Sequence, residues 1–296
     1  MDELESRQDI DQSIDRLLQK ADARYRFPTP VEDIVAAQKL SIARCDDSPL
    51  ALPILVAAPQ AIKERMRAVQ SKILAMLDRT ERLVHLRSEG LEVQNRFNAC
   101  HEVGHDLCPW HSELYYLDSR EQLSPNVRNL FEREANYAAA GLIFQQDVFS
   151  KLARSYQPGF VAIVKLAELF GGSIHAAFRL YIDSSHQAVA GIVLRRSPLG
   201  TDATNYQFYV RSVFASPSFS REFLLLDEPP RQLSSQKYPE LGLAWDTLSH
   251  TNHQGNGQMK ITSRDEKNHN LHFELFSNSY NLFLLIWKPR RRLNFL

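Results

Sequence analysis

The sequence has few cysteines, no excess of either charge and no long apolar run. Three cysteines are too few for a disulfide framework and are typical of a reducing compartment. Lys plus Arg equals Asp plus Glu at 35 each, so no overall field attracts the chain to nucleic acid or an anionic membrane. No run reaches the roughly 18 apolar residues of a membrane span, and the acidic start lacks the features of a signal peptide. We therefore expect a cytoplasmic protein that does not enter a membrane.

The composition is that of an ordinary globular protein, with 44% hydrophobic and 24% charged residues. A chain of 296 residues can form one large or two ordinary domains with a well-buried core. Apolar periodicity predicts helices over 10–25, 31–39, 61–77, 93–107 and 127–145, and short apolar runs predict strands over 40–43, 52–57 and 81–85. This pattern indicates an α+β fold.

The character of the sequence changes near Ser185. Residues 148–184 predict a helical array, with breaks at Pro158-Gly159 and at Gly171-Gly172-Ser173. From Val189 onward, apolar runs separated by polar loops predict strands, and the polar stretch 247–257 predicts a loop. We therefore predict two domains: residues 1–185, including the helical array at about 148–185, and a β-rich α+β domain at 186–296.

The segment His101-Glu102-Val103-Gly104-His105 carries the strongest chemical signal. Two histidines four residues apart lie on one face of a helix and can bind the same zinc ion. Glu102 is then placed to accept a proton from the attacking water and to deliver it to the leaving amine. Small and apolar neighbours favour a helix that is buried on its other faces. We predict a zinc peptidase with His101 and His105 as metal ligands and Glu102 as the catalytic base.

A catalytic zinc site of this kind needs a third protein ligand. The predicted helix after residue 127 offers Glu132, and Asn136 lies one turn further on the same face, where it can hold a histidine ring. Glu134 points about 200° around the helix from Glu132, so only one of the two can bind the metal. We favour Glu132, and Glu134 is the alternative.

His111 is a second alternative for the third ligand, because His101 to His111 fits the spacing HExxHxxGxxH. Cys108 stands where that pattern has glycine, and Cys108-Pro109 lacks the backbone freedom of the glycine turn. Cys100 and Cys108 are too far apart along one helix to form a disulfide. We expect Cys100 to pack in the core or beside the metal ligands.

Taken together, the two motif helices resemble those of the ImmA/IrrE family of bacterial metallopeptidases. Asn95–His105 carries the family's Arg-Phe pair before HExxH, and Glu132–Ala139 carries its Glu-x-x-Ala-Asn-x-x-Ala pattern. Thr29–Ile34 and Leu166–Ala177 are similar to the family's opening and closing helices, so the resemblance covers about residues 28–182. Phe144 departs from the Leu-Leu-Met-Pro that usually follows the second helix.

The resemblance implies a zincin-like domain with a gluzincin-like site, in which His101, His105 and Glu132 bind zinc and Glu102 is the base. It also implies a regulatory endopeptidase that cleaves a helix-turn-helix repressor and thereby derepresses stress-response or mobile-element genes. Some family members carry a GAF-like sensor domain after the peptidase domain. A sensing or docking role is therefore implied for residues 186–296.

Residues 163–181 are similar to a helix-turn-helix, yet Arg179 is the one firm cation of its second helix, 173–181. Phosphate contacts normally need several cations. We therefore expect this segment to serve helical packing and the partner to be a protein substrate rather than DNA. The alternative function is a non-catalytic regulatory or sensor module that retains a zincin fold.

Overall fold

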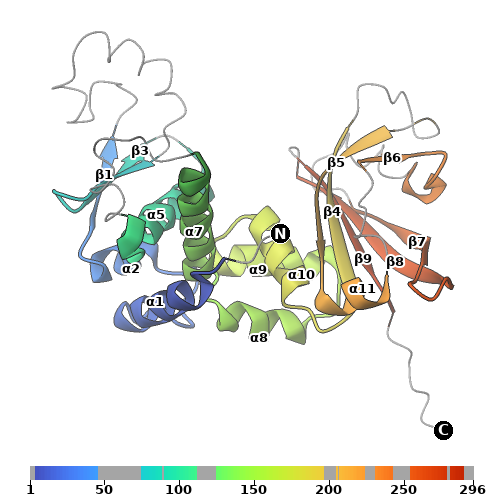
Figure 1. Ribbon diagram of the computed structural model, residues 1–296, viewed down its shortest axis with the longest axis horizontal. Helices are drawn as coiled ribbons and strands as arrows, with labels where there is room; N and C mark the ends of the chain where they lie inside the picture. Colours follow the sequence, from blue (N-terminus) through green and yellow to red (C-terminus); the bar gives the residue numbers. More distant parts are fainter. Residues whose placement is uncertain are drawn as a thin grey trace, which may run out of the picture. The chain divides into compact units, whose positions relative to one another are not determined.

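The computed structural model describes residues 4–45, 75–88, 90–111, 125–196, 205, 207–223, 231–242, 254–278 and 281–289. It is a mixed α+β structure with two separate sheets, which confirms the predicted α+β class (Figure 1). Its internal contacts define two compact units. Unit 1 comprises Met1–Phe149 and Ala167–Ser173, and unit 2 comprises Ser150–Leu166 and Ile174–Leu296. The predicted boundary near Ser185 stays a prediction, because a contact unit is not by itself an independently folding domain.

Unit 1 combines helices with a three-stranded sheet. Its elements are α1 (Arg7–Lys20), α2 (Val31–Ala37), β1 (Ser41–Cys45), β2 (Ala75–Asp78), β3 (Leu83–Arg87), α5 (Glu92–Leu107) and α7 (Pro125–Ile143). The strand order is β1-β3-β2, with β1 parallel and β2 antiparallel to β3. Helices α1, α2, α5 and α7 follow the predicted ranges closely, although α1 ends at Lys20 because Asp22 takes a positive φ of 47°.

Helices α5 and α7 pack unusually closely, because the contact is made at a glycine. A Cβ atom placed on Gly104 would lie 2.8 Å from the carbonyl oxygen of Ala135 and 3.1 Å from the Cβ of Ala138. Any larger residue would force the helices apart. This approach brings the histidine-bearing face of α5 to the glutamates of α7.

Two arginines tie α5 to its neighbours. Arg96 donates hydrogen bonds to the carbonyl oxygens of Thr29 and Gly171, at 2.6 and 3.0 Å. Arg82 makes a two-pronged ion pair with Asp106 at the other end of the helix. Asp106 is nearly buried, so the pair is better shielded from solvent than an ordinary surface salt bridge. These contacts fix the helix at both ends.

The predicted helix over 61–77 is wrong at its C-terminal end. Residues 61–74 lie outside the described residues, but Ala75–Asp78 forms β2. Ala, Met and Leu favour helices intrinsically. Antiparallel pairing of Leu77 with Val84 in β3 overrides that preference. The predicted strand over 52–57 also lies outside the described residues.

Unit 2 is built around a curled antiparallel sheet of six strands, in the order β6-β5-β4-β9-β8-β7 (Figure 1). The strands are β4 (Val189–Arg196), β5 (Gln207–Ala215), β6 (Gln232–Ser234), β7 (Gln254–Thr262), β8 (Asn268–Ser277) and β9 (Leu282–Trp287). Helix α10 (Ile174–Asp183) packs on β4 and β5, and a buried apolar cluster that includes Leu194, Phe208 and Phe273 forms the sheet's core. The strand order does not test the GAF-like expectation.

The structure of unit 2 differs from the sequence-based prediction at several elements. The predicted loop over 247–257 is wrong at its end, since Gln254–Gly257 belongs to β7 and pairs with β8. Gly257 is suited to this strand because a Cβ there would meet the ring of Phe273 at 2.8 Å. Helix α11 (Pro217–Glu222), the short 3-10 helix η1 (Pro239–Gly242) and β6 were not predicted.

The helical array is confirmed as α8 (Asp147–Ser155), α9 (Phe160–Phe170) and α10. Within the described part of the chain, no single helix is both long and apolar enough to cross a membrane. Helices α9 and α10 pass that test only as a pair, with a bend of 116° between them. Most of their large apolar side chains are buried within the protein, including Phe160, Leu166 and Phe178.

Candidate metal centre

Three side chains from α5 and α7 converge on one point. The Nε2 atoms of His101 and His105 are 3.1 Å apart. The carboxylate oxygens of Glu132 lie 3.4 Å from Nε2 of His101 and 3.6 Å from Nε2 of His105. The one-turn spacing of the histidines and the close contact at Gly104 produce this convergence.

The three side chains fit a zinc ion. Tetrahedral zinc with ligand bonds of about 2.0–2.2 Å would separate neighbouring ligand atoms by roughly 3.3–3.5 Å. The distances among the two imidazole nitrogens and the carboxylate are close to that spacing. Two imidazoles and one carboxylate, with a fourth position left open, are also a donor set typical of catalytic zinc.

Both histidines are neutral in this environment. Burial is the main cause that lowers the pKa of His101, and burial with the neighbouring His101 and His111 lowers the pKa of His105 to about 3. A neutral imidazole keeps a lone pair on one ring nitrogen, which metal binding requires. The predicted metal ligands are therefore in the chemical form that can bind zinc at neutral pH.

Asn136 lies where the sequence analysis predicts it, one turn after Glu132 on α7. Its Oδ1 atom is 3.1 Å from Nδ1 of His101. An amide oxygen can only accept a hydrogen bond, so Nδ1 of His101 carries the proton and Nε2 presents its lone pair toward His105 and Glu132. This contact fixes the orientation of the His101 ring, and a role of Asn136 in metal binding stays a prediction.

Glu102 lies beside this group and is almost completely buried. Burial is the main cause that raises the pKa of its carboxyl group to about 7, and the negative charge of Glu132 adds to the effect. A hydrogen bond from the backbone of Leu77 in β2 opposes the shift. A carboxyl group with a pKa near neutrality can both accept and release a proton at cellular pH, as a general base must.

The two alternative third ligands lie elsewhere. Glu134 accepts hydrogen bonds from Nε2 of His111 at 2.7 Å, from Nε1 of Trp110 at 2.8 Å and from the hydroxyl of Ser6. His111 meets Nδ1 of His105 at 3.0 Å, on the side of that ring away from Glu132. The geometry favours Glu132, and its role as a ligand stays a prediction.

Sequence reasoning missed this hydrogen-bonded group behind His105, because a glutamate two residues after a candidate ligand is ordinarily solvated. The sequence feature that could have indicated a buried Glu134 is the apolar stripe of α7. Phe131, Ala135 and Ala138 are buried at helical spacing, and Glu134 falls on the same face, three residues after the first and four before the last. A glutamate on a buried face needs partners, and its carboxylate has three.

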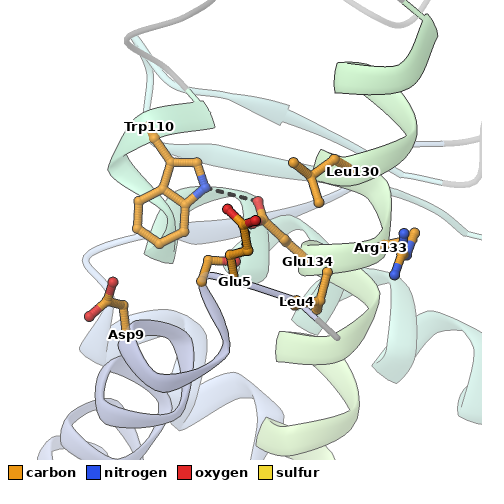
Figure 2. A pocket seen from close by; sticks show the side chains of 8 residues that line it. Leu4, Glu5, Asp9, Trp110, Leu130, Arg133 and Glu134 are labelled. Atoms are coloured by element: carbon orange, nitrogen blue, oxygen red, sulfur yellow. Dashed lines mark hydrogen bonds between the residues drawn. The ribbon is translucent and has the colours of Figure 1, made fainter. Parts of the chain in front are cut away.

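A pocket of about 510 Å³ lies at the outer end of this group, where α1 begins (Figure 2). Figure 2 shows the indole of Trp110 donating to Glu134 at its wall. The lining residues are Leu4, Glu5, Ser6, Asp9, Trp110, Leu130, Arg133 and Glu134. The set includes none of the three candidate zinc ligands.

Comparison with known proteins supports the metallopeptidase interpretation. The family model of the IrrE N-terminal-like domain, a peptidase family, matches residues 62–180, which contain all the candidate ligands and Glu102. This match confirms the resemblance that the two motif helices indicate. No curated protein matches the chain. A solved structure, a Mycobacterium tuberculosis transcriptional regulator, is similar with a TM-score of 0.52 and 12% identity, over 94% of this chain and 86% of that chain. At that identity the likeness shows the fold alone.

Proposed function

We propose that this chain, an ImmA/IrrE family member by its IrrE N-terminal-like domain, is a zinc-dependent, site-specific endopeptidase. The observation that carries the proposal is the convergence of His101, His105 and Glu132, with the buried carboxyl group of Glu102 beside them. The match to a peptidase family supports the same activity.

The proposed roles follow from the chemistry of each side chain. His101, His105 and Glu132 would hold zinc, which when bound polarises the scissile carbonyl and acidifies the attacking water. Glu102 accepts the proton from that water as its oxygen attacks the carbonyl carbon. It then delivers the proton to the amide nitrogen as the C–N bond breaks, so the leaving group departs as a neutral amine.

The proposed substrate is a helix-turn-helix repressor, cleaved in the cytoplasm to derepress stress-response or mobile-element genes. The family resemblance supports this substrate class, and the transcriptional regulator that shares the fold is compatible with a regulatory role. We assign residues 186–296 a sensing or docking role in the same proposal. The near-balanced charge of the chain gives no support to direct DNA binding.

Zinc content is the first test of the site. Wild-type protein should bind one zinc ion per chain, and Glu132→Ala should lose it. Glu134→Ala is the matched comparison two residues along the same helix. It should keep zinc with weakened affinity, since its carboxylate contacts His111, which in turn contacts His105. A wild-type protein that takes up no zinc on reconstitution would contradict the proposed function.

Proteolysis is tested with Glu102→Gln, which keeps the size of the side chain and leaves the metal ligands in place. New protein N-termini are compared in cells that express the wild type or this variant. We expect a new N-terminus inside a helix-turn-helix protein only with the wild type. If the wild type and Glu102→Gln have the same effect on gene expression and neither creates a new N-terminus, the alternative of a non-catalytic sensor module is supported instead.

A further inference from the structure

A chain of hydrogen bonds extends from His105 away from the candidate zinc ligands. Nδ1 of His105 lies 3.0 Å from Nδ1 of His111. Nε2 of His111 lies 2.7 Å from a carboxylate oxygen of Glu134. Both ring nitrogens of each histidine are therefore in contact with a specific partner, and the chain ends on a carboxylate.

The carboxylate determines the direction of every hydrogen bond in this chain. The indole N–H of Trp110, which can only donate, and Nε2 of His111 both approach the same oxygen of Glu134, at 2.8 and 2.7 Å, and the hydroxyl of Ser6 donates to the other oxygen. A carboxyl group that receives this many donors is held as the carboxylate. An ionised carboxylate accepts hydrogen bonds only, so Nε2 of His111 carries a proton. A neutral imidazole carries a proton on one ring nitrogen, so with the proton on Nε2 the Nδ1 atom of His111 is an acceptor. Nδ1 of His105 must then be the donor, and Nε2 of His105 is left with its lone pair facing His101 and Glu132.

Packing keeps the chain in place. His111 is completely buried and its ring stacks on Phe131, with centroids 4.2 Å apart and an interplanar angle of 28°. Glu134 is 2% exposed, and Trp110 and Ser6 donate to it from two other segments. A side chain with so little freedom can fix the orientation of its neighbour.

We propose that His111 and Glu134 are positioning residues that hold the His105 ring in the tautomer and orientation needed to bind zinc. The inference rests on the proposed zinc site and adds to it two residues that act through His105 and are not themselves ligands. Asn136 does the same for His101 through an amide oxygen. His105 differs from His101 because its hydrogen bonds lead through His111 to the carboxylate of Glu134. That negative charge also makes the His105 ring a stronger electron donor to the metal.

The same residues suggest one rival, a second metal ion. Ligand atoms of Cys108, His111 and Glu134 lie within 4.8 Å of one another, and all three residues are buried. A metal at that position would need the lone pair of His111 Nε2, the atom that donates a hydrogen bond to Glu134. A metal there would also break the hydrogen bonds that Glu134 already accepts. The hydrogen-bonded chain is the better account.

The test uses His111→Phe and Glu134→Gln in the full chain. Phenylalanine preserves the stacking on Phe131 but leaves Nδ1 of His105 without its acceptor. Glutamine keeps an acceptor oxygen but removes the charge. Cys108→Ala is the matched control, because Cys108 is buried beside the same ring and is not part of the chain. The zinc dissociation constant is measured by competition with a chelator, and the tautomer of His105 is read from side-chain 15N NMR of the zinc-free protein.

We expect His111→Phe to weaken zinc binding by about 10- to 100-fold, Glu134→Gln to weaken it less, and Cys108→Ala to leave it within about threefold of the wild type. The zinc-free wild type should carry the His105 proton on Nδ1, and His111→Phe should show both tautomers. Should His111→Phe fail to fold, Glu134→Gln and the wild-type tautomer still decide the question.

The inference is overturned if zinc affinity is unchanged in the folded variants or if the wild-type proton sits on Nε2. Two zinc ions per wild-type chain, with one lost in Cys108→Ala, would overturn it in favour of the second metal. A wild type that binds no zinc but shows the Nδ1 tautomer would refute the proposed function and leave the hydrogen-bonded chain intact.

Discussion

Glu102 illustrates how one buried carboxyl group links stability to pH. Burial holds its pKa at about 7, against 4.5 for the free side chain. The folded zinc-free protein therefore binds this proton more tightly than the unfolded chain does. The resulting stabilisation is fully present below about pH 4.5 and is lost as the pH rises through about 7.

We predict that Glu102→Gln removes this pH dependence from the zinc-free protein. Between about pH 5 and pH 8, the wild type should lose roughly 2–3 kcal/mol of unfolding free energy through Glu102, and the variant should not. Urea denaturation in the presence of a chelator at both pH values measures the difference. Equal losses in the two proteins would show that Glu102 does not titrate in this range.

The two described free cysteines should be chemically inert in the folded protein. Burial raises the pKa of both Cys100 and Cys108 to about 12, and reactivity depends on the thiolate form. In a Cys45→Ser background, we expect no alkylation by iodoacetamide in native buffer at about pH 8 and labelling of both thiols in urea. Rapid native labelling of Cys108 would instead reveal a reactive thiol beside the metal centre.

At the candidate metal centre, some residues could be predicted from the sequence and others could not. The HExxH spacing and the pairing of Glu132 with Asn136 follow from helix geometry, and the structure brings His101, His105, Glu132 and Asn136 together, while their roles stay predictions. The role of Glu134 depends on Trp110 and Ser6. Ser6 comes from a distant part of the sequence, and no local pattern predicts which residues will meet in this way.

At the scale of elements, the close contact between α5 and α7 places the candidate ligands from two helices together. We predict that Gly104→Ala destabilises unit 1 by about 2–3 kcal/mol and weakens zinc binding at least tenfold, because the new Cβ would overlap backbone atoms of Ala135 and push α7 away. Thermal unfolding and chelator competition measure the two effects.

Gly141→Ala is the control for that substitution, because Gly141 is also a helical glycine in unit 1. Its new Cβ would meet the terminal methyl group of the Ile14 side chain at 2.7 Å, and its next contact, with Gln146, is an ordinary one at 3.7 Å. The higher helix propensity of alanine, about 1 kcal/mol, offsets part of that contact. We expect zinc affinity to be unchanged here, and equal effects of both substitutions on zinc binding would refute the argument from helix spacing.

The predicted elements differ in how much they depend on distant partners. The long helices α5 and α7 show their type and range in local periodicity, and both were predicted to within a few residues. β2 and β6 have four and three residues, and each exists only through its pairing with a neighbouring strand. A segment that short carries no periodicity of its own, so sequence reasoning assigned the first to a helix and missed the second.

At the scale of the whole molecule, the chain forms two compact units, and the candidate metal centre belongs entirely to one of them. His101, His105, Glu132 and the chain from His111 to Glu134 all lie in unit 1. Composition and periodicity indicated an α+β chain with a β-rich second part. They could not indicate the strand order of the second sheet, in which β4 lies beside the last strand, β9, because that order depends on long-range pairing.

This division predicts that damage to the core of unit 2 leaves zinc binding intact. Gly191 lies in β4 beneath α10, and a Cβ there would lie 2.3 Å from both Phe178 and Ile182. Phe178 is fully buried and stacks on Phe160, so its ring has little room to move. We therefore expect Gly191→Ala to destabilise unit 2 by about 1–3 kcal/mol.

The same variant should bind zinc with wild-type affinity, whereas Gly104→Ala should lose affinity, so the two substitutions separate the units. Zinc titration, with thermal unfolding followed by the fluorescence of Trp110 in unit 1 and Trp287 in unit 2, measures both properties. In a Trp245→Phe background, substituting one of these two tryptophans by phenylalanine at a time assigns each signal. If Gly191→Ala weakened zinc binding as much as Gly104→Ala does, the metal centre would depend on the sheet of unit 2, and a regulatory signal received there would have a direct route to the proposed peptidase site.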